Sequence, residues 1–452
     1  MNESTIVIAA FLALMTFFVP RKYFLVPFIV TFCFVPVDQR IIILTLDFPV
    51  IRILVLIGVL RILLRGEQRL IKWNTFDRLL LAWGLCDAVV YVIQWSDMRA
   101  LIYKSGGLFD LVGLYWLFRQ TIDSWKNMRL MIKILSICVL ILVPLIAFEW
   151  STGRNLFAIL GTIITEERAG RFRCQGAFSH SIMFGLFAAT VVPLFIGMAM
   201  LDKNKALYWV AAAASIFLVM ASASSCPILV LLFILLIMCA FKWRKYTGLA
   251  WKGFFASLII LHIVMKAPVW HLIARVNIVG ASTGWYRFHL INQTIERFSE
   301  WALIGIRSTR HWVVPGYRAL TDITNQYVAI GLSGGIVTLA LFIALLVLAF
   351  RILAKCYQQT RSPAQLWLGW SVFAAMLGHC MAFFGVSYFG QIGLLWFLML
   401  GMVGFVAEEN EKATGETVNL SLRSYKLPVI SELPVTLKHK QVNTHGQNAN
   451  IQ

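Results

Sequence analysis

The stretch that decides the fold is residues 128 to 149, which read MRLMIKILSICVLILVPLIAFE. No charged side chain stands between Lys133 and Glu149. A helix rises about 1.5 Å per residue, so this stretch is about 33 Å long as a helix, enough to cross the hydrocarbon core of a bilayer. The sequence therefore predicts a membrane-spanning helix here.

Comparable apolar runs recur along the chain, separated by short polar breaks. Ten further candidate spans lie near residues 41 to 64, 76 to 95, 101 to 118, 176 to 200, 206 to 221, 227 to 241, 249 to 265, 324 to 350, 364 to 384 and 388 to 407. The first 37 residues add one bent span or two short ones, because Pro20, Arg21 and Lys22 interrupt them. We expect an all-α transmembrane helix bundle of about 12 spans over residues 1 to 407, with 13 as the alternative.

The composition excludes an ordinary soluble protein. Of 452 residues, 60% are apolar and 13% charged, whereas a soluble domain has charged side chains at roughly a quarter of its positions. The 40 Lys and Arg against 21 Asp and Glu give a net charge of +19, which must lie mostly outside the hydrocarbon core. Residues 408 to 452 are rich in polar residues, and we expect a disordered cytoplasmic tail there.

Basic residues indicate the orientation, because they gather in short cytoplasmic loops. Five basic breaks, near residues 61–72, 119–133, 203–205, 242–252 and 351–361, fall on one side by alternation of the spans. Two longer loops, roughly residues 150 to 175 and 266 to 323, fall on the exported side. They carry ten arginines and one lysine: Arg154, Arg168, Arg171, Arg173, Lys266, Arg275, Arg287, Arg297, Arg307, Arg310 and Arg318. Guanidinium groups bind phosphate oxygens in pairs, so these loops predict an anion site; the alternative is that the arginines simply face water.

Several kinds of chemistry have no support in the sequence. There is no GxxxxGK[ST] motif, and no DxD pair to hold a metal on a nucleotide sugar. We therefore expect neither a metal nor a cofactor. The eight cysteines form no CxxC pair, so we interpret them as packing residues, with a Cys174–Cys226 disulfide as the one alternative.

Two segments resemble a known family. Residues 171 to 185 read RFRCQGAFSHSIMFG and precede a span with Pro193; they resemble the R-x-x-G-x-F stretch of the bacterial O-antigen ligase and polymerase superfamily. Gly284-Trp285-Tyr286-Arg287, Ile304-Gly305-Ile306 and Thr324-Asn325-Gln326-Tyr327 with Gly331, Gly334 and Gly335 resemble that family's second exported loop. The resemblance covers roughly residues 75 to 405 in hydropathy. It implies metal-independent glycosyl transfer from an undecaprenyl-diphosphate-linked glycan, on the outer face of a bacterial inner membrane.

The resemblance also assigns roles to residues. Arg173 and Arg287 match the arginines expected to grip the diphosphate, and Arg171 is the substitute for Arg173. Arg307 and Arg310 are further candidates for substrate binding. Ligases of the family carry a His-Asn pair where this chain has Thr324-Asn325, and a Ser-Arg pair is here Ser224-Ser225-Cys226. The missing histidine favours a polymerase over a ligase.

A general base is needed for the acceptor hydroxyl. Asp322 is the first candidate, and His311 and His289 follow. The alternative for Asp322 is a cap on the helix that begins near Thr324, and His289 is alternatively an ordinary loop residue. His180 and Asn325 are candidates for substrate binding, although His180 alternatively bonds to a neighbouring helix.

Other polar and aromatic residues have mainly structural interpretations. Lys104 is expected to pair with Asp87 or Asp110 inside the membrane, either as structural glue or as a proton relay. Gly331 and Gly335 are spaced to let another helix approach closely. Trp301 and Trp312 fit the interfacial aromatic belt, or alternatively stack on sugar rings.

The sequence thus predicts a multi-pass polymerase of surface polysaccharide, an O-antigen or exopolysaccharide of the cell envelope. Its expected partners are undecaprenyl-diphosphate-linked oligosaccharide, membrane lipids, a flippase and chain-length regulator proteins, with no nucleic acid. The alternatives are an O-antigen ligase acting on a lipid A core and, from another class, a lipid-linked oligosaccharide flippase or transporter.

Overall fold

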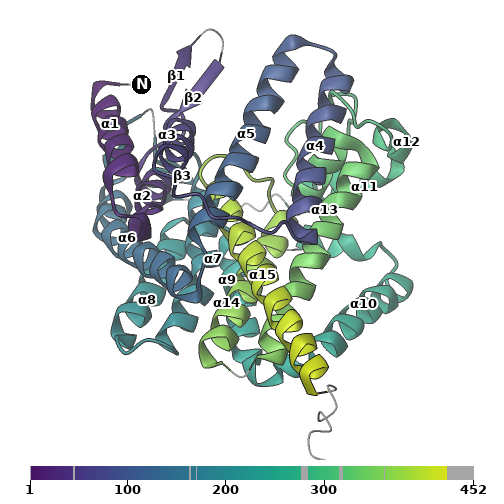
Figure 1. Ribbon diagram of the computed structural model, residues 1–452. Coiled ribbons are helices and arrows are strands. Elements are labelled where there is room, and N and C mark those ends of the chain that lie inside the picture. Colours follow the sequence, from purple (N-terminus) through teal and green to yellow (C-terminus); the bar gives the residue numbers. More distant parts are fainter. Residues whose placement is uncertain are drawn as a thin grey trace, which may run out of the picture. The chain divides into compact units, whose positions relative to one another are not determined.

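The protein is a bundle of helices with two small β-hairpins. The computed structural model describes residues 2–43, 46–161, 164–168, 170–275, 284–314, 319–360 and 362–424, with side chains as far as residue 413. The α-helices are α1 (Glu3–Phe18), α2 (Val26–Phe34), α3 (Val50–Leu64), α4 (Thr75–Trp95), α5 (Met98–Thr121), α6 (Trp125–Thr152), α7 (Ser181–Ala199), α8 (Lys205–Ala221), α9 (Ser225–Cys239), α10 (Thr247–Val264), α11 (Gly284–Glu296), α12 (Phe298–Trp301), α13 (Gln326–Gln359), α14 (Pro363–Phe383) and α15 (Ile392–Ser424) (Figure 1).

The remaining elements are short. Four 3₁₀ helices are η1 (Arg21–Tyr23), η2 (Leu156–Ile159), η3 (Ala240–Tyr246) and η4 (Val269–Arg275). Strands β1 (Arg40–Ile43) and β2 (Leu46–Pro49) form one antiparallel hairpin, and β3 (Glu166–Arg168) and β4 (Arg171–Arg173) form the other. The chain divides into two units, residues 1–410 and 411–452.

Six helical stretches of the described chain are long and apolar enough to cross a membrane. They are α6, α7, the continuous stretch Ser225–Val264, α13, α14 and Ile392–Ala413 of α15. The apolar α1 and α8 are only 16 and 17 residues long, while α4 and α5 are long enough but carry several charged residues. Each expected span contains a helix, and the total of twelve stays a prediction.

The structure moves two of the expected boundaries. Residues 41 to 49 were expected to begin a span, but most of them belong to the β1–β2 hairpin, where β-branched isoleucines favour strand; helix α3 begins after Pro49. The expected start of the tail at residue 408 falls inside α15, which continues to Ser424. Arg318 and Arg361 lie outside the described residues.

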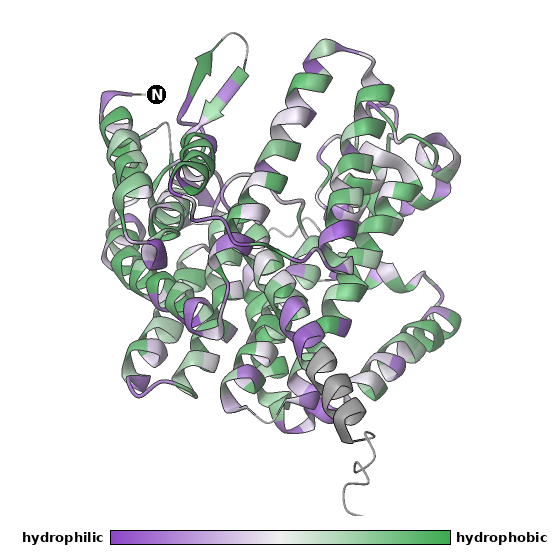
Figure 2. Cartoon of the chain, viewed as in Figure 1, coloured by the Kyte–Doolittle hydropathy of each residue, from purple (hydrophilic) through white to green (hydrophobic). Residues whose placement is uncertain are grey.

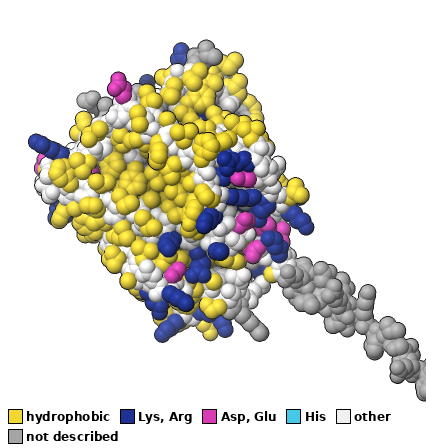
Figure 3. All heavy atoms as spheres, turned by 60° about the vertical axis from the view of Figure 1, so that its left-hand side comes forward, with side chains coloured by type: hydrophobic (Ala, Val, Ile, Leu, Met, Phe, Trp, Pro, Cys, Tyr) yellow, Lys and Arg dark blue, Asp and Glu magenta, His cyan; other side chains and the backbone are white. Residues whose placement is uncertain are grey.

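Helix α7 is the centre of the bundle. Nearly all of its residues are buried, because it packs against α8, α9 and α14 (Figure 1). Apolar residues dominate the helices along most of their length (Figure 2). Apolar side chains also cover most of the face that Figure 3 presents, while lysine and arginine gather toward its lower and right-hand margins. An apolar exterior around an apolar core is what a lipid-facing bundle requires.

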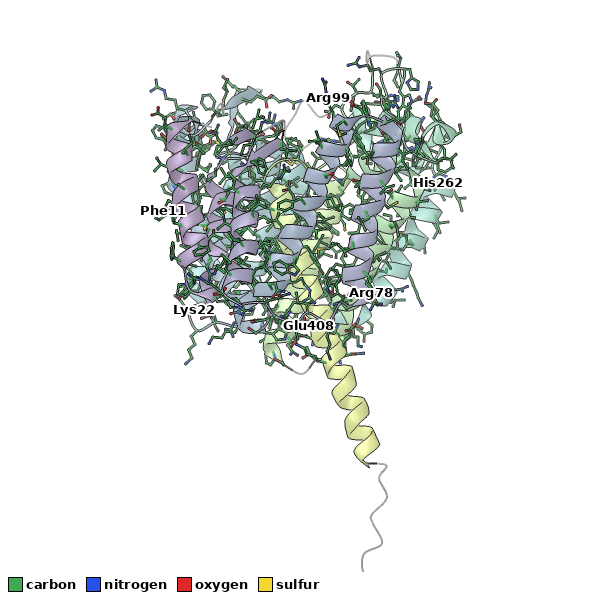
Figure 4. All side chains as sticks on the ribbon, turned by 45° about the horizontal axis from the view of Figure 1, so that its top comes forward. Phe11, Lys22, Arg78, Arg99, His262 and Glu408 are labelled. Carbon is green, nitrogen blue, oxygen red and sulfur yellow. The ribbon has the colours of Figure 1, made fainter. Side chains whose placement is uncertain are left out.

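The bundle has two ends with different residues. At one end, which we call the site end, α6 and α14 finish and α7, α9, α13 and α15 begin. At the opposite end lie Lys22, Arg78 and Glu408, whereas Arg99 lies at the site end (Figure 4). Two ion pairs lie between the ends: Lys104 Nζ is 2.5 Å from Asp87, and Arg52 is 2.5 Å from Asp110. The predicted pairing of Lys104 with Asp87 is therefore confirmed, and Asp110 has another partner.

Candidate functional site

The first loop, residues 153–180 between α6 and α7, is fixed to the bundle by Glu149. This buried carboxylate accepts hydrogen bonds from the backbone N–H groups of Gln175 and Gly176, both at 3.0 Å, and from the Thr165 hydroxyl at 2.9 Å. Gly176 has φ +56°, a conformation that favours glycine. Buried polar groups are normally hydrogen-bonded within the fold. Because the three donors to Glu149 all belong to the loop, this carboxylate holds the loop against the end of α6.

Arg173 on β4 is the cation that this loop presents, and only 4% of it is exposed. Its Nη1 donates to Glu166 Oε2 at 2.5 Å and its Nη2 to Ser224 Oγ at 3.0 Å, while its buried Nε has no partner among the described residues. Burial lowers the pKa of Arg173, and the Glu166 carboxylate opposes that shift. Arginine nevertheless stays protonated, so the loop holds a buried positive charge whose one acidic partner is about half exposed.

The second loop, between α10 and α13, folds around a small core of its own. The buried apolar residues of this core are Leu290, Trp301, Trp312, Val314, Leu320, Val328 and Leu332. The Trp301 indole donates to the Thr294 carbonyl, and the Trp312 indole donates to Glu300. Both tryptophans are buried in this core, so the prediction that they face the membrane interface or a sugar is wrong.

A break in α13 joins this small core to the bundle. Gly335 has φ +72° and interrupts the helix. Backbone groups that have no helical partner at the break bond to the second loop instead. Ile306 N donates to Leu332 O, and Ile336 N donates to Ala302 O, both at 2.7 Å. The spacing of Gly331 and Gly335 predicted that another helix approaches α13 closely. The segment that does so is the loop segment 302–306.

Arg287 on α11 is the cation that the second loop presents. Its Nε donates to the Gly385 carbonyl at 2.9 Å, in the connection between α14 and α15. Its two terminal nitrogens make no hydrogen bond to any described residue, and the side chain is half-buried. Within the described residues, both terminal NH₂ groups of Arg287, with four N–H bonds, are thus left for a ligand.

The partners of the two arginines meet. Ser224, which accepts from Arg173, precedes α9, and Cys226 is two residues further on. A Cβ on Gly385, whose carbonyl accepts from Arg287, would lie 2.8 Å from Cys226 Sγ. Residues far apart in the sequence therefore converge at the site end, where the partners of both arginines lie beside the start of α9.

Three further candidates lie around the start of α13. Asp322 is exposed and its carboxylate bonds to no described residue, whereas Asn325 caps α13 by accepting from Val328 N at 3.1 Å. The alternative of Asp322 as a helix cap is therefore wrong. Both Asp322 and Glu166 act electrostatically on His180, which places all three near Arg173.

His180 is the N-cap of α7. Its Nδ1 accepts from Ile182 N at 3.0 Å, so the expected bond to a neighbouring helix is replaced by one to its own helix. Burial is the largest cause of a lowered pKa for His180, and the positive charge of Arg173 lowers it further. The neutral imidazole accepts a bond at Nδ1 and therefore carries its proton on Nε2.

The remaining candidates are spread over the two loops. Arg307 donates to the Gln94 carbonyl at 2.6 Å and lies over the ring of Trp95, the last residue of α4. His311 bonds to Glu300 at 2.7 Å and thereby lowers the pKa of that carboxyl to about 2. Arg171 and Arg310 are exposed, and within the described residues their side chains make no hydrogen bond or ion pair. His289 stacks on Trp285.

Sequence reasoning missed the residues that hold the site. Glu149 stands alone at the end of an apolar run, and a lone acid in that place is the only signal that could have found it. Glu166 and Gly385 carry no such signal, and Ser224 was marked only by the resemblance of Ser224-Ser225-Cys226 to the family's Ser-Arg pair. Beneath the site, His379 Nδ1 lies 2.7 Å from the Tyr388 hydroxyl, and Tyr388 N donates to Gln326.

No metal-binding group of three or more His, Cys, Asp or Glu side chains occurs among the described residues. All eight cysteines are free thiols, including Cys174 and Cys226. The chain matches no protein-family model, no curated protein and no solved structure.

Proposed function

We propose that this protein is a metal-independent glycosyltransferase that polymerises lipid-linked oligosaccharides into a surface polysaccharide. In this proposal the chain crosses the inner membrane of a bacterium about twelve times, with the site end on the periplasmic side. The donor is an undecaprenyl-diphosphate-linked glycan, delivered by a flippase, and chain-length regulator proteins set the extent of polymerisation.

The observation that carries the proposal is the convergence of Arg173 and Arg287. Both guanidinium groups come from loops rather than spans, and both lie at one end of the bundle beside Cys226 and Gly385. In the part of the chain that the structure describes, neither forms an ion pair with a buried acid. A departing diphosphate is the kind of anion that two arginines in a water-poor site stabilise strongly.

The proposed reaction is a displacement at the anomeric carbon of the donor sugar. The acceptor hydroxyl oxygen forms the new C–O bond while the bond to the diphosphate oxygen breaks, and the diphosphate leaves on its lipid. Arg173 exchanges Glu166 for a diphosphate oxygen, and Arg287 supplies its free terminal N–H groups. Asp322 takes the hydroxyl proton, since its carboxylate is exposed, acts on neighbouring His180 and caps no helix.

The two alternatives differ in what they transfer. A ligase would use the same arginines for one transfer to a lipid A core. A flippase is kept as a candidate because α13 is broken at Gly335 close to Asp87, which pairs with Lys104 and accepts from Ser333 at 2.9 Å. Broken helices beside intramembrane charges occur in transporters.

Deletion of the gene in its own host separates these functions. Lipid-linked oligosaccharides are extracted, and both their length and the leaflet in which they accumulate are measured. A polymerase leaves single units on the periplasmic leaflet with loss of long polymer. Long lipid-linked chains there indicate a ligase, and single units on the cytoplasmic leaflet indicate a flippase. An unchanged profile contradicts the glycan proposal as a whole.

A further inference from the structure

The connection between α14 and α15, residues 384–391, bonds to the second loop and to the helix that follows it. The Gly385 carbonyl accepts from Arg287 Nε at 2.9 Å. The backbone N–H of Tyr388 donates to Gln326 Oε1 at 2.6 Å, at the first residue of α13. This connection therefore holds Arg287 through a carbonyl and the start of α13 through an amide.

The same connection also bonds to the first loop. Gln391 is fully buried, and its Nε2 donates to the Ala177 carbonyl and, at 3.3 Å, to the Val35 carbonyl. Gly390 has φ +68°, and a Cβ there would lie 2.5 Å from Ser179 Oγ, so the position needs glycine for its conformation and for its space. One short segment thus contacts both loops of the proposed site.

A buried histidine fixes this connection from within the bundle. His379 of α14 is fully buried, and its Nδ1 lies 2.7 Å from the Tyr388 hydroxyl. The rings of Phe383 and Trp396 lie edge-on to this pair, at 4.7 Å from Tyr388 and 5.5 Å from His379. A hydrogen bond in such apolar surroundings is strong, and its loss leaves a buried polar group unpaired. Tyr388 is thereby fixed three residues from the carbonyl that accepts from Arg287.

We propose that the 384–391 connection sets the relative position of Arg173 and Arg287, and that Tyr388 and His379 are the positioning residues that fix it. Arg287 bonds to the connection directly, whereas Arg173 belongs to the first loop, to which the connection bonds through a buried amide. A displacement of about 1 Å between groups that hold a transition state can cost up to about 100-fold in rate. This inference rests on the proposed function, and it adds what keeps the two arginines in register.

The first test needs no substrate and uses the full-length protein in lipid nanodiscs. Tyr388→Phe keeps the ring and removes the hydroxyl, so we expect amide hydrogen exchange to rise about threefold in residues 171–180 and in residues 284–296. The matched control is Tyr357, a buried tyrosine toward the far end of α13 whose hydroxyl donates to Thr247 at 3.0 Å. Tyr357→Phe should leave exchange in both segments unchanged. Wild-type exchange of both segments in Tyr388→Phe overturns the inference, whether or not the protein is a polymerase.

The second test is the polymerisation assay. We expect Tyr388→Phe and His379→Leu each to lower kcat about tenfold with little change in the KM for the donor, because misplaced arginines weaken binding of the transition state more than binding of the substrate. The amide of asparagine can replace Nδ1 as a hydrogen-bonding group, so His379→Asn should restore most of the kcat that His379→Leu loses. Equal losses in the leucine and asparagine variants contradict a positioning role for this hydrogen bond.

A double variant shows whether the effect acts through Arg287. In Arg287→Lys the fork that the connection positions is already gone, so adding Tyr388→Phe should lower kcat by clearly less than it does in the wild type. Fully additive losses would mean that Tyr388 supports the fold generally, and they overturn the inference while an active wild-type enzyme leaves the proposed function standing. A wild-type protein without polymerisation contradicts the proposed function, and the exchange measurement then still decides whether the connection holds both loops.

Discussion

The two ends of the bundle use arginine in opposite ways. At the opposite end Arg119, 1% exposed, lies 3.2 Å from Asp77 and 3.1 Å from Glu408, and Arg69 lies 2.9 Å from the same Glu408 carboxylate. At the site end Arg287 bonds to a carbonyl, and Arg173 bonds to a hydroxyl and to an exposed carboxylate. Carboxylates neutralise the arginines at the opposite end, whereas at the site end the positive charge of Arg173 and Arg287 is in excess.

This difference separates structural arginines from those proposed to bind the substrate better than burial does, since Arg119 and Arg173 are both buried. Removing one member of a buried ion pair leaves the other without compensation, so such pairs are sensitive positions for stability. A buried cation whose acid is exposed can exchange that acid for a ligand. The comparison therefore predicts loss of stability at one end and loss of activity at the other.

The largest effect is expected for Arg119→Ala. The substitution leaves the buried Asp77 and part of the Glu408 charge unpaired, which should cost about 3–5 kcal/mol of unfolding free energy. The measurement is denaturation of the purified protein in detergent, followed by circular dichroism. Arg78 lies at the same end but is exposed, so Arg78→Ala should stay within about 0.5 kcal/mol of wild type. Equal losses in the two variants would remove the distinction between paired and unpaired arginines.

The second effect is expected for Arg287→Lys, which should leave the protein inserted and folded. Lysine keeps the charge but has no planar fork to bind two oxygens, so we expect kcat of polymerisation to fall about 100-fold, or roughly 2.7 kcal/mol of transition-state stabilisation. Arg99 is exposed at the same end, and Arg99→Lys serves as the control. Wild-type rates in Arg287→Lys would exclude Arg287 from the reaction.

The sequence predicts the helices and the arginine-rich loops, but not the partners of the arginines. Long apolar runs are sufficient to predict the helices, because hydrophobic length alone decides whether a helix can cross a bilayer. The arginine-rich loops also indicated the end of the bundle at which we place the proposed site. The partners of each arginine were not predictable, since Arg119 meets Glu408 and Arg173 meets Ser224 only through tertiary packing.

The same limit explains the predictions that were wrong. Trp301 and Trp312 have the composition of interfacial residues, but the second loop has enough apolar residues to build a core around them. Asp322 precedes α13 as a cap would, but Asn325 is nearer the first turn and takes that role. Short-range patterns could not decide between two suitable residues.

A smaller effect is expected for Glu149→Gln. Glutamine keeps the size of the side chain but presents an NH₂ group to one of the two backbone donors, Gln175 N or Gly176 N. We expect a loss of about 1–3 kcal/mol and a lower kcat, because Arg173 is held by the loop that these bonds fix. Glu167 is exposed in the same loop, and Glu167→Gln should change neither quantity. A wild-type kcat in Glu149→Gln would show that Arg173 does not depend on this anchor.

The smallest effect is expected at His180 and depends on pH. Its pKa is lowered in the folded protein from the ordinary value of 6.5, so the unfolded chain binds the proton more readily. The contribution of neutral His180 is therefore complete above about pH 6.5 and is lost as the pH falls toward the lower folded pKa. Protonation removes the acceptor for Ile182 N, a cap worth about 1 kcal/mol. Asparagine caps helices without titrating, so in His180→Asn the thermal midpoint should lose this pH dependence between pH 7 and pH 5. If the thermal midpoint falls equally in the wild type and in His180→Asn between pH 7 and pH 5, another group is titrating. The pH dependence would then not come from the histidine beside Arg173.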